Sequence, residues 1–179
     1  ISAGDLIGKK IQVIRHFDAR EHHCWADPAR LQQVFWNLVK NSAKFTPEGG
    51  RIEISTRNNE AHQIIVEIRD NGIGIDQSLM PRIFDAFEQG GGTVTSKYGG
   101  LGLGLAICKR VIDLHQGTIE AQSDGVGSGT TVTVRLPLLS EQASSPAGAP
   151  SDVRPCQCSH FPDPNDAAVT HRCTGFGTR

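Results

Sequence analysis

Two asparagines and a lysine at helical spacing are the side chains of this sequence best suited to phosphate chemistry. Residues 33–46 read QVFWNLVKNSAKFT, in which Asn37, Asn41 and Lys44 follow one another at i, i+4 and i+7. On a helix these side chains form a narrow polar stripe along one edge. Carboxamide oxygens suit a Mg²⁺ ion that keeps much of its water, and an ammonium group suits phosphate. The pattern favours either a metal and phosphate site or an amphipathic helix whose polar edge is solvated.

A carboxylate followed by glycines forms a second candidate site. Asp70 ends an alternating polar and apolar run and opens the sequence DNGIGI. An ionised carboxylate only accepts hydrogen bonds, so Asp70 could take one from an exocyclic amine such as that of adenine. Gly72 and Gly74 carry no side chain that would block a flat ligand from the backbone. Because Asn-Gly is also an ordinary turn dipeptide, the segment taken alone could be a simple loop.

Aromatic and glycine-rich stretches complete the set of candidates. Phe84 and Phe87, in FDAFEQ, precede residues 90–97, a run of glycine and hydroxyl side chains that we expect to be a mobile loop. Residues 98–105, YGGLGLGL, then lead into an apolar-periodic helix. Glycines that let backbone N–H groups converge ahead of a helix favour phosphate oxygens. This run alone is weak evidence, because it has neither the Lys-Ser/Thr of a P-loop nor the order of a dinucleotide fingerprint.

The expected elements place these stretches around one sheet. Asp27 and Pro28 predict the start of the first helix, which should end before Pro47. Two further helices are expected, at residues 78–84, where Pro81 interrupts the pattern, and at 103–115. Alternation predicts strands at residues 10–14, 51–57, 62–69, 117–122 and 129–136. Five strands and about three helices predict an α/β fold with the helices packed on one face of a single sheet.

Composition and length limit the classes of protein that the sequence allows. The 179 residues carry a net charge of −1 with scattered Lys and Arg, which argues against a nucleic-acid or anionic membrane surface. No apolar run reaches the roughly 18 to 20 residues of a membrane helix. We expect one domain at residues 1–139 and a disordered tail, rich in Ala, Ser, Pro and Gly, at residues 140–179.

The cysteines and the first residues bear on where the protein acts. Five cysteines form no disulfide framework over the folded part, which favours a reducing compartment and therefore the cytoplasm. The start, ISAGDLIGKK, is neither a signal peptide nor an initiator methionine. We therefore expect a piece of a longer protein, cytoplasmic whether or not that parent is anchored in a membrane.

The order and spacing of four motifs resemble the ATP-binding catalytic domain of sensor histidine kinases, in the superfamily that also holds gyrase, chaperone and mismatch-repair ATPases. NxxxNxxKFT, DNGIGI, FDAFEQ and GGLGLGLAI follow one another within roughly residues 10–137. The resemblance implies a two-layer α/β sandwich with a mixed sheet, the Bergerat-type ATP-binding fold, and ATP and Mg²⁺ as cofactors. Carried over by position, it assigns Asn37, Asn41 and Lys44 to the N box, with Mg²⁺ on Asn41 and phosphate on Lys44.

The same resemblance assigns roles to the other candidates. Asp70 would bind the adenine amine in a pocket shaped by Gly72 and Gly74. Ser42, where the family often has alanine, is expected to matter little. The remaining matched positions are Phe84 and Phe87 of the F box, and Gly100, Leu101, Gly102, Leu103 and Gly104 of the second glycine box.

The resemblance also favours a kinase over a hydrolase. Hydrolytic members place a glutamate base four residues before the Mg²⁺-binding asparagine, and that position here is Asn37, which is a poor proton acceptor. Transfer of the γ-phosphoryl group of ATP to a histidine is therefore expected. No histidine here stands in the phosphoacceptor context of an acid followed by Arg/Lys-Thr-Pro. The expected partners are a dimerisation and phosphoacceptor domain, in cis or in trans, and a downstream response regulator receiver.

Two alternatives remain open. One is a nucleotide-binding regulatory module that works through protein contacts without phosphoryl transfer, and the other is a serine kinase of the anti-sigma type with the same nucleotide site.

Overall fold

A computed structural model describes residues 8–87 and 102–139 of the chain. In chain order its elements are β1 (Gln12–Phe17), α2 (Pro28–Phe45), β2 (Arg51–Asn58), β3 (Gln63–Asp70), the 3-10 helix η1 (Met80–Arg82), α4 (Gly104–Leu114), β4 (Thr118–Gln122) and β5 (Thr130–Pro137). The expected mobile loop at residues 90–97, the expected tail at residues 140–179, and Gly100 and Leu101 lie outside the described residues.

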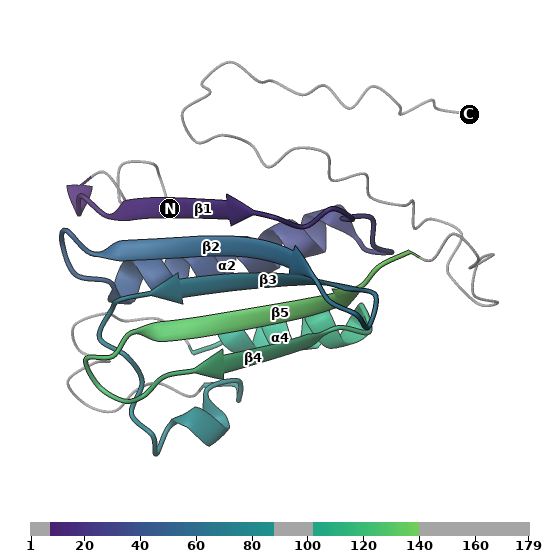
Figure 1. Ribbon diagram of the computed structural model, residues 1–179. Coiled ribbons are helices and arrows are strands. Elements are labelled where there is room, and N and C mark those ends of the chain that lie inside the picture. Colours follow the sequence, from purple (N-terminus) through teal and green to yellow (C-terminus); the bar gives the residue numbers. More distant parts are fainter. Residues whose placement is uncertain (1–7, 88–101, 140–179) are drawn as a thin grey trace, which may run out of the picture.

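The five strands form one mixed sheet in the order β1-β2-β3-β5-β4. β1 and β2 are parallel, whereas the other three neighbouring pairs are antiparallel. Parallel neighbours need a crossover connection, and α2 provides it. Figure 1 shows α2 and α4 on the same face of the sheet, α2 behind β2 and β3 and α4 behind β5 and β4. The fold is therefore the expected two-layer α/β sandwich.

The core lies between the sheet and the two helices. Successive strand residues point to opposite faces, so every second residue of β2, β3 and β5 faces the helices. The largest apolar side chains of this layer that are at most 2% exposed are Val34, Leu38, Ile52, Ile68, Cys108, Ile112 and Val134. Burial of such side chains supplies most of the stability of the domain, roughly 1.5 to 3 kcal/mol for each large one.

Helix α2 begins where the sequence predicts. Asp27 Oδ1 accepts hydrogen bonds from the backbone nitrogens of Ala29 (2.9 Å) and Arg30 (3.2 Å), and Pro28 occupies the first turn. A second contact reinforces this end, because the backbone nitrogen of Asp27 donates to His115 Nε2 at 3.0 Å. The start of α2 is thus tied to the residue that caps the end of α4.

Two elements differ in extent from the sequence-based expectation. β1 continues through Phe17, whereas its polar residues from Arg15 onward were expected to form a connection. An edge strand paired with only one neighbour needs no apolar alternation to pair its backbone. The helix expected at residues 78–84 is only the 3-10 turn η1, because Pro81 has no N–H to donate.

No helix within residues 8–87 and 102–139 is both long enough and apolar enough to cross a lipid bilayer.

Candidate nucleotide site

The carboxylate of Asp70 is buried at the end of β3, where the sequence places it. It is 7% exposed, and its Oδ1 accepts hydrogen bonds from the backbone nitrogens of Gly72 at 3.0 Å and Thr130 at 3.3 Å. Both backbone donors engage the same oxygen, so the carboxylate is held in one orientation with acceptor capacity left on its other oxygen. This is the chemistry needed to receive a hydrogen bond from an amine.

Ser42 of α2 contributes a third donor to the same carboxylate. Its hydroxyl hydrogen-bonds Asp70, and the serine itself is 4% exposed. Burial raises the pKa of Asp70 above its ordinary value, while the bonds from Gly72, Ser42 and Thr130 act in the opposite direction. Ser42 was expected to matter little, yet it is the residue that joins the N-box helix to Asp70.

Gly72 allows another part of the protein's own backbone to approach closely. A Cβ at Gly72 would lie 2.6 Å from the carbonyl oxygen of Phe45 and 2.8 Å from Asp70 Oδ1. The backbone nitrogen of Ile73 donates to that same Phe45 oxygen at 3.1 Å. Gly74 adopts a positive φ of 70°, which glycine allows without strain. Gly72 therefore lets the DNGIGI loop lie against the end of α2, and Gly74 lets it lie against Gly125, whose backbone oxygen would be 2.0 Å from a Cβ at Gly74.

The three N-box side chains lie along one helix, as predicted, and all are half-buried. Burial and the nearby charge of Lys40 lower the pKa of Lys44 from its ordinary value. Lys44 Nζ also lies 5.0 Å from the centre of the Phe45 ring, a cation–π contact. A partly desolvated ammonium group interacts more strongly with a phosphate than one fully in water.

Asn37 connects the N box to α4. Its side chain hydrogen-bonds Cys108, whose Sγ donates to the backbone oxygen of Val34 at 3.7 Å. The Asn37 contact acts to lower the pKa of the thiol. Burial prevails, however, and raises the pKa of Cys108 to about 11, so the thiol is protonated at neutral pH.

The F box and the glycine box meet through their backbones. The backbone nitrogen of Phe87 donates to the oxygen of Gly102 at 3.1 Å, and both residues have a positive φ, 67° and 69°. Phe84 packs against the core, whereas Phe87 is 72% exposed. The residue before the segment 88–101 and the residue after it are thus hydrogen-bonded to each other.

The first turn of α4 can receive an anion. Leu103 precedes it without a side-chain cap, the first turn contains no acidic residue, and a Cβ at Gly104 would meet nothing within 4 Å. Uncapped N–H groups at a helix start carry a partial positive charge suited to phosphate. The described part of the glycine box is therefore compatible with the predicted phosphate contact, which stays a prediction.

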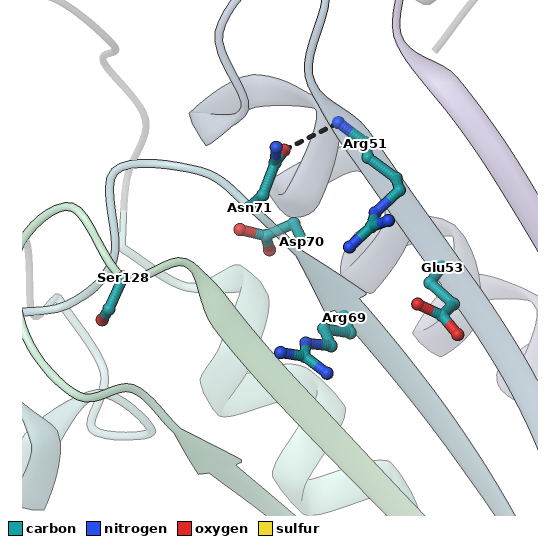
Figure 2. A pocket seen from close by; sticks show the side chains of 6 residues that line it. All are labelled: Arg51, Glu53, Arg69, Asp70, Asn71 and Ser128. Carbon is teal, nitrogen blue, oxygen red and sulfur yellow. Dashed lines mark hydrogen bonds between the residues drawn. The ribbon is translucent and has the colours of Figure 1, made fainter.

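A shallow polar pocket opens beside Asp70 (Figure 2) and is not lined by the N box. The Asn71 amide oxygen accepts a hydrogen bond from the backbone nitrogen of Arg51 at 2.7 Å. The two guanidinium groups of the lining are balanced by two carboxylates, so the pocket has no strong preference for either sign of charge. Its lining consists of Arg51, Glu53, Arg69, Asp70, Asn71 and Ser128.

Sequence reasoning missed three residues that hold the site together. The sequence pattern predicts only helix positions for Ser42 and Cys108 and a position in the last strand for Thr130. Helical spacing does put Ser42 beside the polar stripe, but nothing local indicates that β3 ends next to it. Contacts across 60 residues, such as that of Thr130 with Asp70, follow from sheet order and have no signature in a local pattern.

Comparison with known proteins points to one family. Residues 26–140 match the profile of the histidine kinase-, DNA gyrase B- and HSP90-like ATPases. Hybrid signal transduction histidine kinase D of Dictyostelium discoideum is 40% identical over 136 residues, which cover 63% of this chain and 9% of that protein. Sensor histidine kinase WalK of Bacillus subtilis is 37% identical over 133 residues, covering 74% and 22% respectively. The chain therefore spans less than a quarter of the length of these relatives.

Solved structures share the fold. Full-length ShkA, solved in complex with AMPPNP, superposes with a TM-score of 0.65 at 26% identity, over 79% of this chain and 28% of that one. Histidine kinase ThkA, solved in complex with the response regulator protein TrrA, gives a TM-score of 0.61 at 27% identity, over 77% and 37%.

Proposed function

Because the chain belongs to the family of histidine kinase-, DNA gyrase B- and HSP90-like ATPases, we propose that it binds Mg-ATP and donates the γ-phosphoryl group to a histidine. The acceptor histidine would lie on a dimerisation and phosphoacceptor domain, in cis or in trans. The observation that carries the proposal is the buried carboxylate of Asp70, held by two backbone amides and bonded to the N-box helix through Ser42.

Asp70 would recognise the base. A buried carboxylate with one oxygen already engaged by Gly72 and Thr130 offers its second oxygen to the exocyclic amine of adenine. Guanine presents a carbonyl oxygen at the corresponding position, so the same carboxylate disfavours it. AMPPNP, the ligand in the ShkA structure, is an adenine nucleotide, which supports this assignment.

The N box fits a Mg²⁺ ion that arrives with the nucleotide. Within the described residues no group of three or more His, Cys, Asp or Glu could hold a metal ion. A half-buried carboxamide oxygen at Asn41 is the kind of single neutral ligand that suits Mg²⁺ shared with substrate phosphates and water. When bound, the ion would neutralise charge on the phosphates.

Phosphoryl transfer needs positioning and charge neutralisation more than covalent help from the protein. Lys44 and the N–H groups at the start of α4 would hold the phosphates, and the half-buried Asn37 would lie beside Asn41 on the same edge of α2. An imidazole nitrogen of the acceptor histidine would form the new bond to the γ-phosphorus while the bond to the bridging oxygen breaks, leaving ADP. Asn37 is no general base for water, which favours transfer over hydrolysis.

We further propose a response regulator receiver as the downstream partner and the cytoplasm as the compartment. The ThkA structure contains a response regulator, which supports the first. The buried thiol of Cys108 is compatible with a reducing compartment.

The test is transfer of labelled phosphate from γ-labelled ATP to a dimerisation and phosphoacceptor domain of a related kinase, supplied in trans or fused to the full chain. We expect label on the acceptor that is lost in acid, as phosphohistidine is, and no label with Asn41→Ala. ATP binding without transfer to the fused acceptor would favour a regulatory module. Acid-stable label on a serine would favour the anti-sigma type of kinase.

A further inference from the structure

The ammonium group of Lys9 lies at the end of the N-box helix. Its Nζ donates hydrogen bonds to the backbone oxygens of Ala43 at 2.9 Å, Lys44 at 3.0 Å and Thr46 at 3.1 Å. An ammonium group has three protons, and three carbonyl oxygens receive them. These contacts link positions 34 to 37 residues apart in the chain.

Lys9 completes the hydrogen bonding at this helix end. The last four carbonyls of a helix have no partner within it. Here the backbone oxygen of Ser42 accepts a hydrogen bond from Thr46 N at 2.9 Å, and that of Phe45 accepts one from Ile73 N at 3.1 Å. Lys9 donates to the two carbonyl oxygens between them, those of Ala43 and Lys44. The positive charge also lies at the negative end of the helix dipole. The last turn of α2, which carries Lys44, is therefore held from one side by Lys9 and from the other by the DNGIGI loop.

The backbone around Lys9 fixes its side chain at this point. The Lys9 oxygen accepts from Gly49 N at 2.8 Å, and Gln12 N donates to Gly50 O at 2.9 Å. Lys10 adopts a positive φ of 51° and pairs with Glu48 at 3.2 Å, with its side chain 78% exposed. Two adjacent lysines thus have different environments, since one caps the helix and the other lies at the surface.

We propose that Lys9 is a positioning residue for Lys44: by capping the last turn of α2 it holds the phosphate-binding ammonium group in place. The inference rests on the proposed function, because it assigns Lys44 to the phosphates. Without the cap, three carbonyls lose this donor, two of them in α2, and the last turn loosens. Lys44 would then sample positions away from the phosphates, while Asp70, held by Gly72 and Thr130, keeps its orientation.

The test compares Lys9→Met with Lys10→Met in the full chain. Affinities for ATP and for adenosine are measured by competition against a fluorescent ATP analogue with Mg²⁺ present. We expect Lys9→Met to weaken ATP binding by roughly three- to tenfold, the effect of losing one or two ordinary hydrogen bonds, with adenosine affinity unchanged within about twofold. Lys10→Met should match the parent for both ligands, because an exposed ion pair contributes little.

Loss of ATP and adenosine binding by the same factor would overturn the proposal, because it would indicate a purely structural cap. Retention of full ATP affinity would also overturn it. In a Lys44→Met background, Lys9→Met should add no further loss, and an undiminished loss there would show that Lys9 does not act through Lys44. If Lys9→Met does not fold, Lys9→Gln keeps N–H donors without the charge and should give a smaller loss of ATP affinity alone. A parent chain that binds neither ligand would contradict the proposed function itself and this inference with it.

Discussion

The hydroxyl of Ser42, in the middle of the N-box motif, hydrogen-bonds the carboxylate of Asp70 at the end of β3. The two residues belong to different motifs, one expected to serve the phosphates and the other the base. Because both are buried, their contact fixes the helix and the strand end relative to each other. The same two segments meet again where Ile73 N donates to Phe45 O at 3.1 Å.

Ser42→Ala should weaken adenine nucleotide binding by roughly two- to tenfold, which corresponds to the net value of one hydrogen bond. The substitution removes a donor that favours the ionised form of Asp70, so the pKa of Asp70 should rise further. ATP affinity measured against pH should therefore begin to fall at a higher pH than in the parent. Ser55→Ala, on the uncovered face of β2, is the control. If ATP affinity depends on pH in the same way for Ser42→Ala and Ser55→Ala, the prediction is contradicted.

Asp70→Asn should stabilise the nucleotide-free chain near neutral pH. Burial raises the folded-state pKa of Asp70 above the ordinary 3.8, so the folded state binds more protons than the unfolded state between these two values. The free energy of unfolding of the parent chain therefore decreases as pH rises through that window, and it stays lower at neutral pH than below the window. Asparagine carries no charge to desolvate and can still accept from Gly72 and Thr130. Urea unfolding should show that Asp70→Asn increases the free energy of unfolding by more at about pH 7 than at about pH 4.5. An equal increase at the two pH values would refute this account.

The thiol of Cys108 should resist alkylation in the folded chain. It is fully buried, with its pKa raised to about 11, so little reactive thiolate forms near neutral pH. Peptide mass spectrometry after treatment with iodoacetamide at about pH 8 should find Cys108 unmodified without denaturant and modified in concentrated guanidinium chloride. Rapid native-state labelling would mean that the contact between α2 and α4 opens readily.

His115→Ala should destabilise the fold by about 1 kcal/mol, because it removes the acceptor of the Asp27 backbone amide. The ring also contacts the Val111 backbone oxygen through Nδ1 at 2.7 Å, so both nitrogens are engaged. His62→Ala is the matched control, since His62 lies at the surface, 4.0 Å from Glu21. Denaturant unfolding should separate the two variants, and equal midpoints would argue against a clamp between the helices.

The elements and their order could be predicted because their signals are local. Asp27 and Pro28 define a helix start by themselves, and alternation locates β2, β3, β4 and β5 to within one or two residues. The polar half of β1 could not be predicted. It pairs only with β2, whose residues lie 39 positions later in the chain (Gln12 with Arg51 at the first pair), and pairing at a sheet edge leaves no pattern in the sequence.

The candidate site was only partly predictable. Motif order predicts roles for Asn41, Lys44 and Asp70, because each motif carries residue types that suit one part of a nucleotide, and these roles stay predictions. The supporting contacts of Ser42, Lys9 and Thr130 depend on where the ends of distant elements meet. These contacts depend on how the whole sheet packs against the two helices, so a local sequence pattern cannot predict them.

The central claim is that the chain binds Mg-ATP and that Asp70 recognises the adenine. It is tested most directly by the binding of a fluorescent ATP analogue to the full chain and to Asp70→Asn, each with and without Mg²⁺. Asp76→Asn is the control, because Asp76 is an exposed carboxylate in the same loop, bonded only to Ser78 at 2.8 Å and 2.6 Å among the described contacts. The account predicts binding that ATP displaces, that Mg²⁺ strengthens, and that Asp70→Asn weakens by about 1.5 to 3 kcal/mol while Asp76→Asn leaves it unchanged. Nucleotide affinity unaltered by Asp70→Asn would contradict the account.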